Sequence, residues 1–166
     1  MPHISHKTLS DPIVVAGFQI RTTNARELSG EGQIRALWQR FFIENLAAQI
    51  PNRTNDSLYA VYSNYQSDET GEYNYLLGAP VTGVDHLPAG MTYAAIATGE
   101  YAVMTTEKGP IIQVMQQAWR EIWALTPGEL GGKRAFLSDY EIYDHRASDP
   151  TNAQVEIHLG LAAQNQ

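Results

Sequence analysis

A glutamate within an aromatic and apolar stretch is the residue of this sequence best suited to chemistry. Residues 135–146 alternate as a β-strand does, and a period of two places Glu141 and Tyr143 on one face together with Leu137 and Asp139. A carboxylate in such surroundings either faces water or lines a cavity that favours a positive charge. Partial desolvation would also raise the pKa of Glu141, as a general acid or base requires. Glu141 is therefore predicted to anchor a cation or to act as a catalytic carboxylate.

Five further residues are candidates for the walls of a ligand site around that glutamate. Tyr62 and Tyr75 lie in two expected strands of the first half of the chain, and Tyr143 shares the face of the carboxylate. Trp123 lies near the end of an amphipathic helix, from which it can reach a cavity rim. Aromatic ring faces contribute about 0.5–2 kcal/mol each to the binding of a cation. His158 completes the set, although a lone histidine that alternates with apolar strand residues is more often a hydrogen-bonded surface residue.

The composition is that of one ordinary globular domain, and it excludes several kinds of site. A chain of 166 residues is long enough to bury a core of its own. It contains no cysteine, which excludes disulfides, zinc–thiolate sites and thiol catalysis. Its net charge of −7 argues against nucleic-acid binding, because phosphate contacts require a basic patch. No two histidines have metal-ligand spacing and no glycine-rich motif joins a strand to a helix, so we expect no metal and no cofactor.

The sequence also contains no sign of membrane insertion or export. No run of residues is apolar over the length needed to span a bilayer. Residues 1–12 are polar and lack the apolar centre of a signal peptide. We therefore expect a cytoplasmic protein without a membrane partner.

The chain consists of two halves, about residues 12–82 and 91–162, with the same order of elements. In each half, the alternation and spacing of apolar residues predict a strand, a helix and two strands. The expected elements are strands 12–23, 58–65 and 73–81 with helix 33–50, and strands 91–107, 135–146 and 154–161 with helix 111–125. Two such halves under a pseudo-twofold axis predict an α+β fold, in which a mainly antiparallel sheet carries two helices on one face and a central ligand groove on the other.

This duplicated β-α-β-β order resembles the gyrase-inhibitor-like small-molecule-binding superfamily, which includes the effector-binding domains of AraC-type and multidrug-sensing activators. Three segments carry the resemblance: the helix from Trp119 to Trp123, the Tyr-Glu-Ile-Tyr strand at 140–143 and the Val-Glu-Ile-His strand at 155–158. It implies a concave centre that binds lipophilic, often cationic, compounds against a central glutamate, whose position Glu141 matches. Nothing before Ile13 or after Leu161 resembles a helix-turn-helix, so the chain is most similar to the stand-alone, integron-associated effector-binding proteins of that superfamily.

Three functions are compatible with these observations. The first is the capture of a lipophilic, cationic aromatic compound, for sensing or sequestration of a drug or effector, with Glu141 as the countercharge. The second is hydrolysis of a reactive xenobiotic, in which Glu141 activates water and Tyr143 donates a proton; some stand-alone members that this chain resembles are hydrolases. The third is inhibition of a protein partner through the acidic surface. We expect the first, with a small molecule as the partner and no direct contact with nucleic acid.

Overall fold

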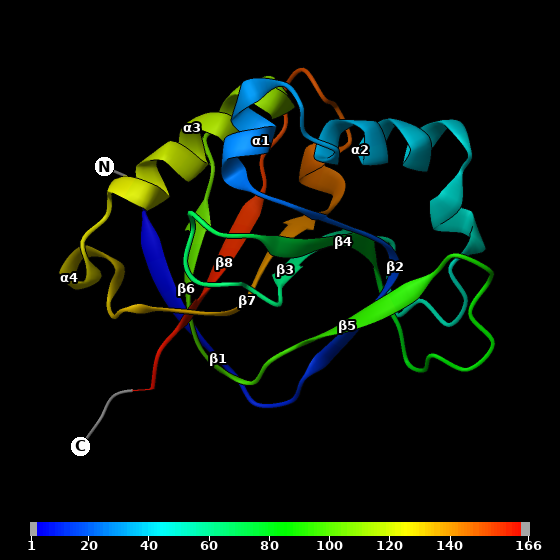
Figure 1. The fold of residues 1–166 in the computed structure, drawn as a ribbon, viewed down its shortest axis with the longest axis horizontal. Helices are drawn as coiled ribbons and strands as arrows, with labels where there is room; N and C mark the ends of the chain where they lie inside the picture. The colour runs from blue at the N-terminus through cyan, green and yellow to red at the C-terminus, as the bar shows by residue number, and fades with distance from the viewer. Residues whose placement is uncertain (1–2, 164–166) are drawn as a thin grey trace.

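The computed structural model describes residues 3–163 and has an α+β fold (Figure 1). The strands are β1 (Ile4–Leu9), β2 (Ile13–Thr22), β3 (Leu58–Ser63), β4 (Tyr73–Pro80), β5 (Thr92–Ile96), β6 (Gly99–Thr105), β7 (Arg134–Tyr143) and β8 (Glu156–Leu161). The α-helices are α1 (Asn24–Ser29), α2 (Ile34–Ile43), α3 (Ile111–Ala124) and α4 (Pro127–Leu130), and short 3-10 helices occupy Leu46–Gln49 and His145–Ala147. These strands form one eight-stranded antiparallel sheet in the order β1-β6-β8-β7-β3-β4-β2-β5. The predicted α+β class with a mainly antiparallel sheet is confirmed.

The order of the strands shows the duplication. β3 and β7 pair at the centre of the sheet, and the corresponding strands of the two halves follow outward, β4 and β2 on one side and β8 and β6 on the other. The outermost strands are exchanged between the halves, because β1 pairs with β6 whereas β5 pairs with β2. Each half thus contributes an edge strand to the other half, and the two halves interlock.

Two strands differ from the sequence-based expectation. Residues 4–9 form β1, whose side chains are mostly exposed, so the apolar alternation that marks a half-buried strand is missing. The strand expected at 91–107, with a bend near Gly99, is two strands, and Gly99 begins the second with a φ of 138°, a value that favours glycine. This break sends β5 and β6 to opposite halves of the sheet.

The first long helix is shorter than the helix expected at 33–50. It ends at Ile43 because Asn45 adopts a left-handed conformation with a φ of 51°. A 3-10 turn then buries Leu46 and Ile50, which had extended the apolar pattern beyond the helix. None of the helices within residues 3–163 has the length and apolar character needed to cross a membrane.

Helices α2 and α3 cover one face of the sheet (Figure 1). Their apolar residues recur at spacings of three and four, so each helix presents one apolar stripe to the strands. Leu37 and Phe41 of α2 and Ala118 and Ile122 of α3 are buried there. Each stripe covers one half of the sheet. Larger side chains fill the space between the two helices.

The opposite face is filled by apolar side chains near the centre of the sheet. A cluster of buried apolar residues occupies it: Leu9, Val15, Val61, Leu76, Ile96, Tyr101 and Tyr140. The β5–β6 connection passes on this side, away from the helices (Figure 1). The backbone N–H of Ala97 in that connection donates to Oγ of Ser138 on β7 at 3.0 Å. The crossing follows from the exchanged edge strands, since β5 and β6 belong to opposite halves of the sheet.

A close approach of β2 and β4 gives a prediction about stability. Gly17 and Gly78 lie directly opposite each other, and a Cβ added at Gly78 would overlap the backbone carbonyl of Ala16. We expect Gly78→Ala to lower the free energy of unfolding by about 1–3 kcal/mol, because the two strands must separate to admit the methyl group. Urea denaturation measures the change. Gly83→Ala is the matched control, since no atom lies within 4 Å of a Cβ added there, and equal effects of the two substitutions would contradict the prediction.

Candidate ligand-binding site

Glu141 is buried beneath the helices, with only 1% of its surface exposed. It lies in β7 directly opposite Ala60 of β3 and Ile157 of β8, both of which belong to the clusters that pack against α2 and α3. The strand alternation thus placed Glu141 and Tyr143 on one face, as predicted. The structure shows that this face is the one covered by the helices.

Three uncharged side chains donate hydrogen bonds to the Glu141 carboxylate. Tyr62 Oη and Trp119 Nε1 donate to Oε2 at 2.9 and 2.7 Å, and Tyr143 Oη donates to Oε1 at 2.7 Å. The ion pairs found within residues 3–163 do not include Glu141. The carboxylate is therefore held by dipoles alone, and no cationic side chain of the described chain neutralises it.

Burial shifts the acid–base behaviour of this group and of its donors. Loss of solvent raises the pKa of Glu141, and the hydrogen bonds from Tyr143, Trp119 and Tyr62 oppose that rise because they stabilise the charged form. The pKa of Tyr62 and that of Tyr143 are both raised well above the ordinary value, first by burial and then by the charge of Glu141. The two hydroxyls consequently stay protonated and remain donors at neutral pH.

Aromatic rings from both halves close around the carboxylate. Trp38 of α2 donates from Nε1 to Tyr75 Oη at 2.8 Å, and its ring meets the ring of Tyr143 edge-on with the centroids 4.6 Å apart. Tyr62 contacts Tyr75 and Trp119, with centroids 5.1 and 5.2 Å apart. The structure thus brings together Glu141, Tyr143, Tyr62 and Tyr75 of the predicted site residues, and we name these four with Trp38 and Trp119 the glutamate cluster.

The two tryptophans of this cluster are the residues that sequence reasoning missed. Trp38 and Trp119 occupy the apolar stripes of α2 and α3, where a core role was the natural interpretation. Trp123, which was predicted instead, lies one turn beyond Trp119, with the ring centroids 6.3 Å apart, and does not bond to the carboxylate. Its Nε1 is buried without a hydrogen-bond partner among the described residues. The indole N–H of a tryptophan on a buried stripe is the signal that could have identified such a donor, since it usually requires an acceptor.

His158 lies on the opposite face of the sheet and is not part of the glutamate cluster. Its ring stacks on Tyr140 with the centroids 4.3 Å apart, and its Nε2 lies 2.9 Å from Oε1 of Glu156. It is 2% exposed, so the expectation of a surface histidine is also wrong, and burial lowers its pKa. The reason is the alternation of β8, in which Ile157 and Leu159 face the helices and His158 faces the other way.

A second buried carboxylate lies two residues before Glu141. Asp139 is 0% exposed and accepts a hydrogen bond from Arg134 Nη2 at 2.6 Å and from the backbone N–H of Gly160 at 2.8 Å. Tyr65 Oη donates to it as well. Unlike Glu141, it is neutralised by an ion pair with Arg134, whose side chain is 11% exposed.

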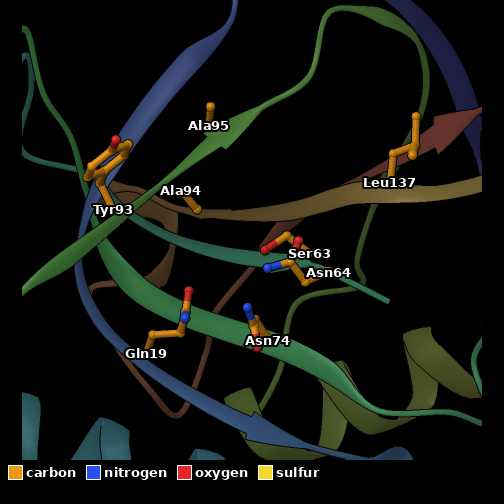
Figure 2. Close-up of a pocket in the computed structure, with 8 residues that line it drawn as sticks. All are labelled: Gln19, Ser63, Asn64, Asn74, Tyr93, Ala94, Ala95 and Leu137. Carbon is orange, nitrogen blue, oxygen red and sulfur yellow. The ribbon is translucent and has the colours of Figure 1, made fainter. Parts of the chain in front are cut away.

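The described cavities lie away from the glutamate cluster. Figure 2 shows a polar cavity of about 310 Å³ in which residues of β5 lie across from residues of β2, β3 and β4; it is lined by Gln19, Ser63, Asn64, Asn74, Tyr93, Ala94, Ala95 and Leu137. A second cavity of about 430 Å³ is lined by residues that include Pro12, Tyr59 and Pro80. No group of three or more acidic or histidine side chains within residues 3–163 could hold a metal ion. The rings of the glutamate cluster pack on one another, so a ligand must separate them to reach the carboxylate.

The raised pKa of Glu141 gives a prediction about pH. A carboxyl group whose pKa is higher in the folded protein than in the unfolded chain binds its proton more tightly when folded, so its contribution to stability is present at low pH and is lost as the pH rises through the folded pKa. We expect wild type to lose stability relative to Glu141→Gln as the pH rises from about 4 through the carboxyl range. Thermal or urea unfolding across this range measures the difference, with Glu107→Gln as the control at an exposed position. A difference independent of pH would contradict the burial of an ionisable Glu141.

Comparisons with known proteins agree with this fold. Residues 8–161 match the family described as integron-associated effector binding protein. The putative transcriptional regulator YobU of Bacillus subtilis (strain 168) is 34% identical over 160 residues, which cover 96% of each protein. The structure of an integron cassette protein from the mobile metagenome of Vibrio cholerae aligns with a TM-score of 0.76 and 27% identity over 96% of this chain and 95% of that one.

A more distant structure shares the fold alone. It is that of SAV2435 bound to tetraphenylphosphonium, with a TM-score of 0.77 and 16% identity over 96% of this chain and 94% of that one. The match over most of the chain and the identity to YobU establish the family. The chain therefore belongs to the integron-associated effector-binding protein family, and small-molecule binding is the function that this membership defines.

Proposed function

We propose that the protein captures lipophilic organic cations between α2 and α3, with Glu141 as the countercharge and the rings of the glutamate cluster as walls. The observation that carries the proposal is the burial of Glu141 without a cationic partner in the described chain. An ionised carboxylate removed from water costs several kcal/mol unless it is compensated. Three dipolar donors offset part of this cost, and a bound cation would offset the rest.

The surroundings of Glu141 suit a delocalised cation better than a compact one. A lysine ammonium or a metal ion requires several oxygen or nitrogen ligands to replace its water, whereas this site offers one carboxylate among rings. A lipophilic cation carries little bound water and gains contact with the ring faces, at about 0.5–2 kcal/mol for each. The cation that is bound to SAV2435, which has the same fold, is of this kind and supports the proposed ligand class.

Entry of a ligand requires the glutamate cluster to open. The hydrogen bond from Trp38 to Tyr75 ties α2 to the sheet, and the bond from Trp119 to Glu141 ties α3 to it. A ligand that replaces Trp119 as the partner of the carboxylate repays part of the free energy needed for opening. Apparent affinity is reduced by whatever free energy the opening costs, so substitutions that loosen Trp38 can strengthen binding.

The arrangement favours binding over hydrolysis. A general base must have a carboxylate oxygen directed at water or substrate within hydrogen-bonding distance. In Glu141, Oε2 accepts two hydrogen bonds and Oε1 accepts one, all from side chains of the protein. While the cluster is closed, neither carboxylate oxygen faces water. We propose accordingly that the protein senses or sequesters an effector.

The proposal is tested with two ions of equal shape and opposite charge, tetraphenylphosphonium and tetraphenylborate. We expect wild type to bind the cation and not the anion, and Glu141→Gln to lose affinity for the cation on the order of tenfold or more, which corresponds to the loss of a close charge. Isothermal titration calorimetry measures binding, and quenching of tryptophan emission reports contact with the cluster. Cation affinity should also fall as the pH falls and Glu141 becomes protonated.

The control for this experiment is Glu107→Gln, which removes an exposed charge and should bind as wild type does. Equal affinity of wild type and Glu141→Gln for the cation would show that the carboxylate is not the countercharge. Equal affinity for the cation and the anion would show that the site selects for apolar shape rather than for charge.

A further inference from the structure

The face of β7 beneath the helices carries two buried carboxylates, and only one of them is neutralised. Asp139 and Glu141 are separated by one residue, which places their Cα atoms about 7 Å apart along the strand. Both are essentially without solvent, at 0% and 1% exposure. Asp139 forms an ion pair with Arg134, whereas Glu141 has no cationic partner among residues 3–163.

Arg134 lies beside the glutamate cluster and not in a separate compartment. Its guanidinium carbon lies 5.8 Å from the ring centroid of Trp119, the same ring that donates to Glu141. On its other side it lies 4.4 Å from the ring centroid of Phe136. Trp119 is thus a wall shared by the neutralised carboxylate and by the free one.

A local distortion of β7 brings the arginine to this position. The pairing of β7 with β8 shifts register between Arg134 and Asp139, and Phe136 within this bulge has a φ of 52°. A bulky residue with a left-handed backbone is uncommon and indicates that the surrounding structure enforces it. Because of the bulge, Arg134 can contact Asp139, which lies five positions later in the strand. A regular strand would not permit this contact.

We propose that Arg134 is a specificity-determining residue that limits the ligand to a single positive charge. The inference rests on the function proposed above and concerns the same site. With Arg134 in place, the two carboxylates and the guanidinium leave one net negative charge in the interior. A monovalent cation matches that charge, whereas a divalent cation would leave one buried positive charge uncompensated, at a high cost in a medium of low dielectric constant.

The test compares two cations of nearly equal size and shape. N-methyl-phenylpyridinium carries one positive charge, and methyl viologen replaces its phenyl ring by a second charged pyridinium ring. Wild type should prefer the monovalent cation. Arg134→Met releases the charge of Asp139 and should shift the ratio of the two dissociation constants toward the divalent cation on the order of tenfold or more. Calorimetry gives both dissociation constants without relying on tryptophan fluorescence.

Two further variants keep the test decisive if Arg134→Met does not fold. Asp139→Asn leaves the guanidinium beside the Trp119 ring without its partner and should weaken binding of the monovalent cation on the order of tenfold. The double variant Arg134→Met with Asp139→Asn removes both charges, restores one net negative charge and should return the ratio toward that of wild type. Arg26→Met removes an exposed guanidinium and is the control for loss of an arginine elsewhere.

The outcomes separate this inference from the function on which it rests. If wild type binds the monovalent cation through Glu141 but the folded charge variants keep the wild-type ratio and affinities, the role of Arg134 is overturned and the countercharge function stands. If wild type binds neither cation, or if Glu141→Gln binds both unchanged, the countercharge function fails and the role of Arg134 fails with it. A reversed preference in Arg134→Met that the double variant cancels would establish the role.

Discussion

The structure depends on a carboxylate that is buried without a cation. Glu141 is closed off from water by the rings of the glutamate cluster and by aliphatic neighbours such as Ile157, and only the dipoles of Tyr62, Tyr143 and Trp119 reach its oxygens. Those donors must themselves be held in place, because a hydrogen bond in a dry interior is effective only if its geometry is fixed. The packing of α2 and α3 on the sheet supplies that fixation, and it leaves the carboxylate without a cationic partner among the described residues.

The duplicated fold explains why such a site can be assembled from a short chain. β3 and β7 meet at the centre of the sheet, so each half contributes one side of the glutamate cluster. Trp38 and Tyr75 come from the first half, and Glu141 and Trp119 come from the second. The exchange of the edge strands β1 and β5 interlocks the halves and covers part of the face opposite the helices.

Two carboxylates on one strand show how position decides chemistry. Asp139 and Glu141 share a face and a depth, yet one is paired with Arg134 and the other with neutral donors. The difference arises from the bulge in β7, which brings Arg134 within reach of Asp139 and not of Glu141. The ion pair of Asp139 and the irregular pairing of β7 with β8 therefore occur together.

The sequence was enough to predict the α+β class, the duplication, and the face shared by Glu141 and Tyr143, because these follow from the periods of two and of three to four along strands and helices. It did not determine which sheet face the helices cover, that Trp38 and Trp119 are the helical members of the glutamate cluster, or that His158 lies on the other side. It also did not identify Arg134 as the partner of Asp139. Those outcomes depend on strand exchange, on a bulge and on the registry of helix against sheet, which are contacts between residues far apart in the chain, so only the tertiary structure decided them.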